Sequence, residues 1–328
     1  MKKCVFILPF FGELKSYFSM FIESFKNNDK FDLLLVTDNE ISSQKNVKVV
    51  NMSFDDCISL FQSKFDFKIS LKNPYKLCDF KPAFGYIFSE YINGYEYWGH
   101  CDSDLIFGDL NNLLYPLFEK GYDKIFTPGH LTIYKNTFEN NTLFMKLKFN
   151  NELCYKRAYT SDDIFVFDED LYAINVHSVF LDNNRNIFVN DLSFNVSTRY
   201  YRIVRSTYFP ESRTWNDIYK RKYQLYWSNG KVYGIYLSHG KLITEEFLYF
   251  HIQKRPMKNI IDISGGDKTI MLLPEAFKLV DNVPSSVKEY KKQNHIYINK
   301  NAINRYIFRL KSKRWQKLSP YRLRNPYH

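Results

Sequence analysis

Two apolar patterns alternate along the first part of the chain, and this alternation constrains the fold more than any other feature. Cys4–Phe10 is a continuous apolar run, as in buried parallel strands, and apolar residues then recur with helical spacing over 18–25. Further strand-like runs follow at Leu33–Thr37 and Val47–Met52. A helix is expected to begin at Ser53, where Asp56 completes a capping box.

An acidic motif follows the next two elements. Asp79 is expected to cap a helix that has Pro82 in its first turn, and Tyr95–Cys101 is expected to form a strand. Asp102-Ser103-Asp104 comes directly after that strand. Strands that alternate with helices predict an α/β fold with a parallel sheet covered on both faces, and such sheets bind ligands outside the carboxyl ends of their strands. Asp102 and Asp104 are therefore expected in that crevice.

The composition supports a large globular core, because 45% of the 328 residues are hydrophobic and 18% are aromatic. The five cysteines are scattered without metal-knuckle spacing, so they favour neither a disulfide framework nor a zinc ribbon, and a reducing cytoplasm fits best. Cys4–Phe11 is too short to span a bilayer, and no small-residue cleavage site follows it. We interpret this segment as a buried strand, with a signal peptide as the alternative.

The net charge of +11 is concentrated at the C-terminus. Residues 288–328 contain seven Lys, five Arg and one acidic residue, Glu289, whereas acidic and basic residues balance in 1–287. Ile303, Tyr306, Ile307 and Leu310 would share one face of a helix, which could lie on an anionic membrane surface. The alternative is a helix that packs on the rest of the protein with a solvated basic face. Nucleic-acid binding would need a recognition fold, which the sequence does not contain.

Two groups of residues suggest chemistry. Carboxylates at positions i and i+2 of a strand end, such as Asp102 and Asp104, can approach one divalent cation, although the same spacing occurs by chance and recurs at Asp168 and Asp170. His251 follows a buried aromatic run; its imidazole suits Mn²⁺, and Lys254 would supply a charge for phosphate oxygens. Each group also has an ordinary interpretation, as a capped turn and as a packed histidine.

Several segments together resemble the metal-dependent nucleotide-sugar glycosyltransferases of the GT-A fold, and most closely a family found in bacterial capsule and O-antigen gene clusters. The resemblance covers most of residues 1–256. The carrying segments are CVFILPFFGE, KLCDFKPAFGYIFSEYINGYEYWGHCDSDLIFGDL, FTPGHLTIYKN, FDED and HIQKRP. It implies that Asp102 and Asp104 bind Mn²⁺ or Mg²⁺ and the donor, that His251 completes the metal shell, and that Lys254 holds the diphosphate. The spacing from His251 to Lys254 departs from the H-x-x-G-x-x-K element of better-known retaining families.

The resemblance implies a Rossmann-type, mostly parallel sheet in one catalytic domain, with a basic helical tail. Residues 1–128 would form its nucleotide-sugar-binding half, residues 129–287 its acceptor-binding half, and residues 288–328 the tail. The implied activity is transfer of a sugar from a UDP-linked donor to a glycan of the capsule or O-antigen. The glycan would be carried on a lipid at the inner face of the cytoplasmic membrane, where the tail would hold the enzyme peripherally.

An inverting enzyme also needs a carboxylate as general base. The resemblance favours Asp168 and Glu169, at the start of an expected helix, over Asp162 and Asp163, which suit an exposed turn; ordinary acids of a first helical turn are the alternative. Weaker candidates for donor contacts, each with a packing, turn or capping alternative, are Pro9, Phe10, Phe11, Asp38, Asp79 and Lys81, and His130 could line the acceptor side.

Two rival functions stay open. A metal-dependent nucleotidyltransferase or phosphotransferase also uses paired aspartates on an α/β sheet, and would cleave the donor between its phosphates. A basic protein that binds nucleic acid or a membrane surface, with a degenerate site, would depend on residues 288–328.

Overall fold

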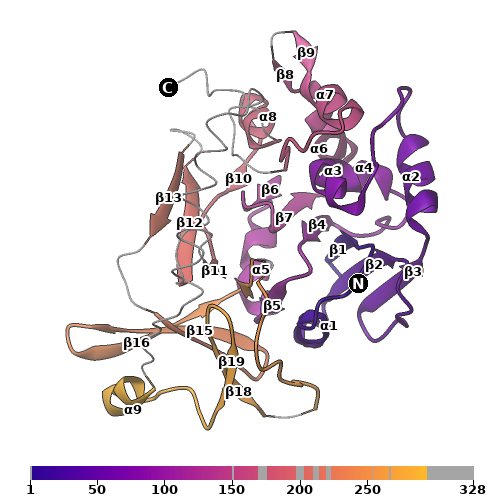
Figure 1. The fold of residues 1–328 in the computed structure, drawn as a ribbon. Coiled ribbons are helices and arrows are strands. Elements are labelled where there is room, and N and C mark those ends of the chain that lie inside the picture. The colour runs from indigo at the N-terminus through magenta and orange to yellow at the C-terminus, as the bar shows by residue number, and fades with distance from the viewer. Residues whose placement is uncertain are drawn as a thin grey trace, which may run out of the picture.

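The computed structural model describes residues 2–149, 151–168, 176–196, 203–209, 214–218, 223–253, 255–265 and 267–293 (Figure 1). A mixed sheet forms the N-terminal part. Its strands, from one edge to the other, are β10 (Ile187–Phe188), β6 (Lys124–Ile125), β7 (Leu131–Lys135), β4 (Tyr97–Cys101), β1 (Cys4–Pro9), β2 (Phe31–Thr37) and β3 (Val47–Asn51). Only β7 runs against the others in this sheet of the described chain. The α/β class predicted from the sequence is therefore confirmed.

The strand order places a switch point between β1 and β4. The chain proceeds from β1 to β2 and β3 on one side, and then returns to add β4 on the other side of β1. Connections on the two sides of such a point lead away from each other, and ligands of open α/β sheets bind there, at the carboxyl ends of the strands. Asp102 is the first residue after β4 and therefore lies at this switch point.

Helices cover both faces of this sheet because its strands alternate their side chains. Val5 and Ile7 of β1 face one hydrophobic cluster, and Cys4, Phe6 and Leu8 face the other. The first cluster is covered by α2 (Phe54–Gln62), α3 (Leu77–Phe80), α4 (Phe84–Ile87), α7 (Cys154–Thr160) and α8 (Val176–Asp182). The second is covered by α1 (Phe18–Lys26) and α5 (Leu110–Glu119). α6 (Phe138–Thr142) packs against α4, and β8 (Lys148–Phe149) and β9 (Glu152–Leu153) form a small hairpin.

A second sheet joins distant parts of the sequence. Its order is β13 (Thr214–Ile218), β12 (Ile203–Phe209), β11 (Ser193–Val196), β17 (Tyr249–His251) and β5 (Leu105–Phe107). β5 follows Asp104 directly, so this sheet connects the acidic motif to the end of β17. The first sheet in turn takes strands from both sides of residue 128, and the two expected halves thus share their sheets within one fold.

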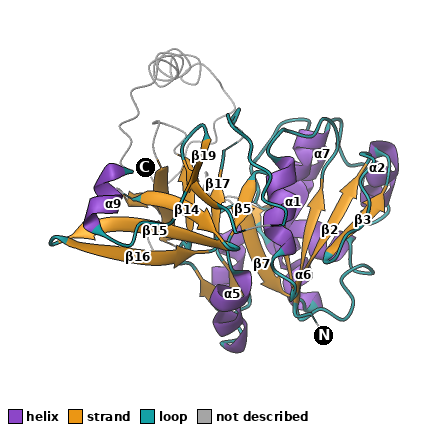
Figure 2. Cartoon of the chain, turned by 90° about the horizontal axis from the view of Figure 1, so that it is seen from below, coloured by secondary structure: helices purple, strands orange, loops and turns teal. Residues whose placement is uncertain are grey.

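A third, antiparallel sheet lies at the end of the molecule away from β2, β3 and α2 (Figure 2). Its order is β16 (Lys241–Phe247), β15 (Lys231–Ser238), β14 (Gln224–Ser228), β18 (Thr269–Leu272) and β19 (Phe277–Val280). α9 (Val287–Lys292) follows it and includes the first residues of the basic tail. The rest of the tail, with its expected amphipathic helix, lies outside the described residues.

One helix differs from its prediction. Instead of a helix capped by Asp79, the structure has a broken helical segment that begins at Asn73, whose side chain accepts from the Lys76 N–H. Asp79 lies inside this segment with no exposed surface. A residue with helical neighbours on both sides cannot serve as an N-cap, because the first turn is already formed. Among the described residues, none of the helices is long and apolar enough to cross a membrane.

Candidate metal and donor site

Backbone pairing brings Asp102, Asp104 and His251 together. Asp102 ends the pairing of β4 with β7 through its N–H, which donates to the His130 carbonyl at 2.9 Å. β17 pairs with β5 so that His251 lies opposite Leu105, and the Ile252 N–H donates to the Asp104 carbonyl at 2.9 Å. The antiparallel pairing of β17 with β5 therefore places His251 beside the acidic motif, although the two are far apart in the sequence.

The side chains of these three residues converge. One ligand atom from each lies within 4.8 Å of the others, and they form the one such group among the described residues. The His251 Nε2 atom lies 3.3 Å from Asp104 Oδ1 and 4.0 Å from Asp102 Oδ2. Asp104 and His251 are buried, and Asp102 is partly exposed at the crevice. The pairing of Asp102, Asp104 and His251 expected from the sequence is thus present in space.

Asn195 orients the His251 ring. β11 runs parallel to β17 with Asn195 opposite His251, and Asn195 Oδ1 lies 2.8 Å from His251 Nδ1. When Nδ1–H donates to this oxygen, the neutral ring directs the lone pair of Nε2 toward Asp104. An imidazole lone pair that faces a carboxylate oxygen needs a proton or a cation between the two atoms. The Gln253 Nε2 atom also lies 3.3 Å from Nδ1, so Asn195 is one of two side chains that contact this nitrogen.

The geometry fits a small divalent cation. Mg²⁺ binds octahedrally with ligands at about 2.1 Å, so that neighbouring ligand atoms lie about 3.0 Å apart. The separations of 3.3 and 4.0 Å from His251 Nε2 are close to this spacing. Two carboxylates and an imidazole are also a donor set that suits Mn²⁺. The partly exposed side of Asp102 leaves room for a ligand that approaches from the crevice.

Lys81 connects this cluster to Asp168. Its Nζ atom lies 2.8 Å from Asp102 Oδ1 and 3.0 Å from Asp168 Oδ2, and it donates to the Gly129 carbonyl at 2.8 Å. Burial alone would lower the pKa of the Lys81 ammonium, but the Asp102 and Asp168 carboxylates outweigh it and hold the pKa well above its ordinary value. Lys81 is consequently a cation that pairs with both carboxylates.

Asp79 has a different role from Lys81, although both were expected to face the donor. Asp79 is fully buried and forms an ion pair with Lys76 at 2.7 Å. Its oxygens also accept the N–H groups of Phe165, at 3.0 and 3.2 Å, and Phe167, at 3.1 Å. A carboxylate enclosed in this way binds the protein backbone and is not exposed to a ligand. The expected contact between Asp79 and the donor is therefore not supported.

His130 lies behind the cluster. Its ring lies against that of His251, with centroids 4.3 Å apart and planes inclined by 37°, and its Nδ1 lies 2.9 Å from the Tyr249 hydroxyl. Burial and the neighbouring His251 lower the pKa of His130 well below its ordinary value, so the ring is neutral. Tyr17, at the start of α1, is also buried nearby, and burial together with Asp104 and Asp102 raises its pKa. These contacts place His130 as a support for His251, where the sequence suggested the acceptor side.

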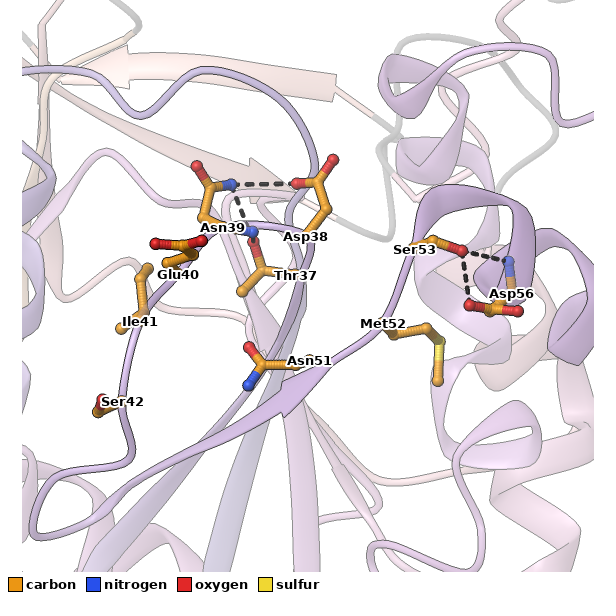
Figure 3. A pocket seen from close by; sticks show the side chains of 10 residues that line it. All are labelled: Thr37, Asp38, Asn39, Glu40, Ile41, Ser42, Asn51, Met52, Ser53 and Asp56. Atoms are coloured by element: carbon orange, nitrogen blue, oxygen red, sulfur yellow. Dashed lines mark hydrogen bonds between the residues drawn. The ribbon is translucent and has the colours of Figure 1, made fainter.

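An open pocket of about 710 Å³ lies at the carboxyl ends of β2 and β3 (Figure 3). Polar and acidic side chains dominate its lining, which comprises Thr37, Asp38, Asn39, Glu40, Ile41, Ser42, Asn51, Met52, Ser53 and Asp56. The Gly12 N–H donates to Asp38 at 3.3 Å, and Asn39 donates to the Gly12 carbonyl at 3.0 Å, so the loops after β1 and β2 are joined. Asp38 thus lies in a pocket, as a donor-binding residue would.

The remaining predicted residues are placed as follows. Pro9 is buried as the last residue of β1, and Phe10 packs on Phe18 with ring centroids 5.6 Å apart, which matches their packing interpretation. Asp168 is buried beside Lys81. Glu169 and Lys254 lie outside the described residues, so the candidate base and the candidate diphosphate ligand have no structural description here.

Asn195, Tyr249 and Tyr17 are the site neighbours that the sequence did not indicate. None of them belongs to a motif, and each reaches the site only through strand pairing or helix packing. An asparagine opposite a histidine on a neighbouring strand has no local sequence signal.

The fold and the site define an α/β protein with a carboxylate–imidazole cluster at a topological switch point. The chain belongs to a family of unknown function (DUF6625), whose model matches residues 6–281. No curated protein is significantly similar to the chain. The matched range includes the described residues of the cluster and the pocket, and all of the three sheets except the first two residues of β1.

Proposed function

We propose that the protein is a metal-dependent glycosyltransferase of GT-A type that transfers a sugar from a nucleotide donor to a glycan. The observation that carries the proposal is the convergence of Asp102, Asp104 and His251 at the switch point of the sheet. The mostly parallel sheet and the position of the acidic pair after β4 are what the sequence resemblance implies. A UDP-linked sugar is the donor to test first.

The local chemistry supports a site for a cation and a diphosphate. The carboxylates of Asp102 and Asp104 and the imidazole of His251 offer oxygen and nitrogen ligands, and the Lys81 ammonium beside Asp102 adds a positive charge near them. A cation bound there would act as a Lewis acid that neutralises the departing nucleoside diphosphate. Asp102 would bind the cation through Oδ2, while its Oδ1 remains paired with Lys81.

The nucleoside part of the donor would bind in the pocket at the ends of β2 and β3. β1 separates β2 from β4, so two strand spacings of about 4.8 Å place the two sites about 10 Å apart along the sheet edge. A nucleoside can bridge this gap, with its base or ribose in the pocket and its phosphates at the cluster. Asp38, Asn39 and Ser53 offer hydrogen-bonding groups for a base or for ribose hydroxyls.

Asp168 is better suited to bind a donor-sugar hydroxyl than to remove a proton. Its carboxylate is buried, and its Oδ2 atom is already held by the Lys81 ammonium. It can still accept a hydrogen bond from the sugar. The general base of an inverting reaction would then be another group, such as Glu169.

The setting of the proposed reaction follows from the same resemblance. The acceptor would be a lipid-linked glycan for capsule or O-antigen, and the basic residues 288–328 would hold the protein peripherally on the inner face of the cytoplasmic membrane. Binding of the chain to vesicles with anionic lipid, with and without these residues, tests this part separately.

Calorimetric titration of the purified chain with UDP, GDP and CMP, each with and without Mn²⁺, tests the proposed function. We expect one nucleoside diphosphate to bind only with the metal, and the matching nucleotide sugar to yield free nucleoside diphosphate. Asp29→Asn, a change at an exposed aspartate away from the site, is the matched control for Asp104→Asn. Failure of all nucleotides to bind a folded wild-type chain would contradict the proposal, and release of a sugar phosphate would indicate nucleotidyl transfer instead.

A further inference from the structure

The segment that leads into Asp168 contacts the stretch from Ser70 to Lys81, which includes the broken helical segment, at several points. Ser70 and Lys72 contact the Asp162 carboxylate, and the Lys76 ammonium donates to the Asp163 carbonyl. Asp79 then accepts the N–H groups of Phe165 and Phe167. Contacts therefore continue along both segments until Lys81 meets Asp168.

The centre of these contacts is the Lys76–Asp79 ion pair. Both side chains are sealed from solvent, with 1% and 0% of their surface exposed. A buried ion pair is weak evidence of a stabilising role, because burial costs each charge its hydration. The additional hydrogen bonds from Phe165 and Phe167 suggest that this pair serves to fix the conformation of the backbone.

That conformation is strained at one residue. Val166 has a φ of 52°, in the left-handed region, which is a true outlier for a β-branched side chain. Val166 stands between the two residues whose N–H groups bond the same carboxylate. For both N–H groups to point at Asp79, the residue between them has to turn. Such strain persists only where the surroundings determine the conformation, and it gathers at functional sites.

We propose that Asp79, held by Lys76, is a positioning residue that fixes Asp168 against Lys81, and that the turn at Val166 is imposed by this clamp. The clamp is defined as Lys76, Asp79 and residues 163–168. This inference rests on the proposed function for its catalytic meaning, because Asp168 would contact the donor. The clamp itself is a property of the fold and can be tested without any substrate.

Hydrogen exchange measured on the full chain tests the clamp directly. In Asp79→Ala, the peptide that covers residues 161–168 should exchange on the order of tenfold faster, while peptides of β1 and β4 keep the wild-type rate. The double variant Lys76→Met/Asp79→Asn keeps an oxygen for the two N–H groups and leaves no buried charge, so it should restore much of the protection. Unchanged exchange in Asp79→Ala, or equal acceleration in all peptides, would overturn the proposal.

The strain at Val166 provides a second test. Val166→Gly removes the side chain that disfavours the left-handed conformation, and should keep or raise the melting temperature. Ile164→Gly, in the same segment at a residue without positive φ, is the matched control and should lower it by about 2 °C. Equal losses in the two variants would show that Val166 is not the strained point.

A thermal double-mutant cycle connects the clamp to Asp168. The change in melting temperature caused by Asp168→Asn should shrink to less than half in the Asp79→Ala background, because Asp168 no longer sits against Lys81. Additive changes would overturn the positioning role.

Turnover of a nucleotide sugar tests whether the clamp matters for catalysis. With Mn²⁺ and UDP-glucose, UDP-galactose or UDP-N-acetylglucosamine as probes, UDP release by Asp79→Ala should fall about 100-fold while its Mn²⁺ affinity stays at the wild-type value. A variant that loses metal affinity in proportion would contradict local positioning. If the wild-type chain binds no metal and releases no UDP, the proposed function fails, and exchange and the thermal cycle still decide the clamp.

Discussion

Asp79 and Asp104 are both buried carboxylates of the same half of the fold, yet their surroundings differ in kind. Asp79 is surrounded by donors, namely the Lys76 ammonium and the N–H groups of Phe165 and Phe167. Asp104 faces the Nε2 atom of His251, whose other nitrogen is turned to Asn195. Asp79 is held by donors of the fold, whereas Asp104 belongs to a group of two carboxylates and an imidazole that could hold a metal ion.

The comparison shows why a carboxylate in a motif does not reveal its role. Asp79, in the sequence DFKP, and Asp104, in the sequence DSD, lie in the same segment that carries the resemblance, and both were expected to face the donor. The structure distinguishes the two carboxylates by their neighbours. Asp79 is surrounded by hydrogen-bond donors of the fold and has a structural role, whereas Asp104 lies beside another carboxylate and an imidazole and is a candidate metal ligand. Four predictions sharpen this difference.

The largest expected effect is on stability, from removal of the Lys76 charge. Lys76→Met leaves the Asp79 carboxylate buried without its cation, and should lower the free energy of unfolding by about 3–5 kcal/mol in a urea titration. The matched control is Lys72→Met, whose exposed pair with Asp162 should contribute little. Equal effects of the two substitutions would mean that the buried pair is no more important than a surface one.

Asp104→Asn should have the opposite profile. The amide keeps the shape of the carboxylate, so the free energy of unfolding should change little, but the loss of the anion should weaken Mn²⁺ binding by about 100-fold, or about 2.7 kcal/mol. Calorimetry with Mn²⁺ alone measures this change. Wild-type affinity in this variant would remove Asp104 from the metal site and end the contrast with Asp79.

Asn195→Ala tests whether the orientation of His251 matters. Without the Asn195 oxygen, the His251 ring is free to take the other tautomer, and Mn²⁺ affinity should fall by about 10–100-fold. Asn183→Ala removes an asparagine that bonds only locally, to the Val179 carbonyl, and serves as the control. If both variants bind Mn²⁺ like the wild type, His251 does not depend on Asn195.

Much of the first sheet could be predicted because its signals are local. The apolar run of β1, the helical spacing in α1, the cap of α2 at Ser53 and the strand before Asp102 all appear as expected. Such elements bury their side chains over a few consecutive residues, so periodicity is enough to find them. The helix around Asp79 was placed wrongly because Asp and Pro are also start signals, and the competing cap at Asn73 lies six residues earlier.

The site could be predicted only in part, for a physical reason. Asp102, Asp104 and His251 were selected because their residue types are those that bind metals, and the structure brings them together. Asn195 was missed because its position depends on the pairing of β11 with β17, which are separated by more than fifty residues. Lys76 and Asp79 are three residues apart, which is the spacing of a helical ion pair, but the N–H groups of Phe165 and Phe167 reach Asp79 from more than eighty residues away. The turn at Val166 between them therefore has no local sequence signal.

His177 extends the comparison to a third buried group, one that stays neutral. Burial, with Lys124 adding to it, lowers the pKa of the His177 imidazole well below its ordinary value. Below about pH 6.5 the unfolded chain therefore binds a proton that the folded chain refuses, and stability falls as the pH decreases toward the folded pKa. Between pH 7.5 and 5.5, His177→Gln should lose about 1 kcal/mol less of its unfolding free energy than the wild type, measured by urea titration at each pH.

His100 and His130, which share the lowered pKa, remain in both proteins, so the difference isolates His177. Parallel pH profiles would show that His177 is protonated equally in the folded and unfolded chains, and that burial alone does not keep a side chain neutral in this fold.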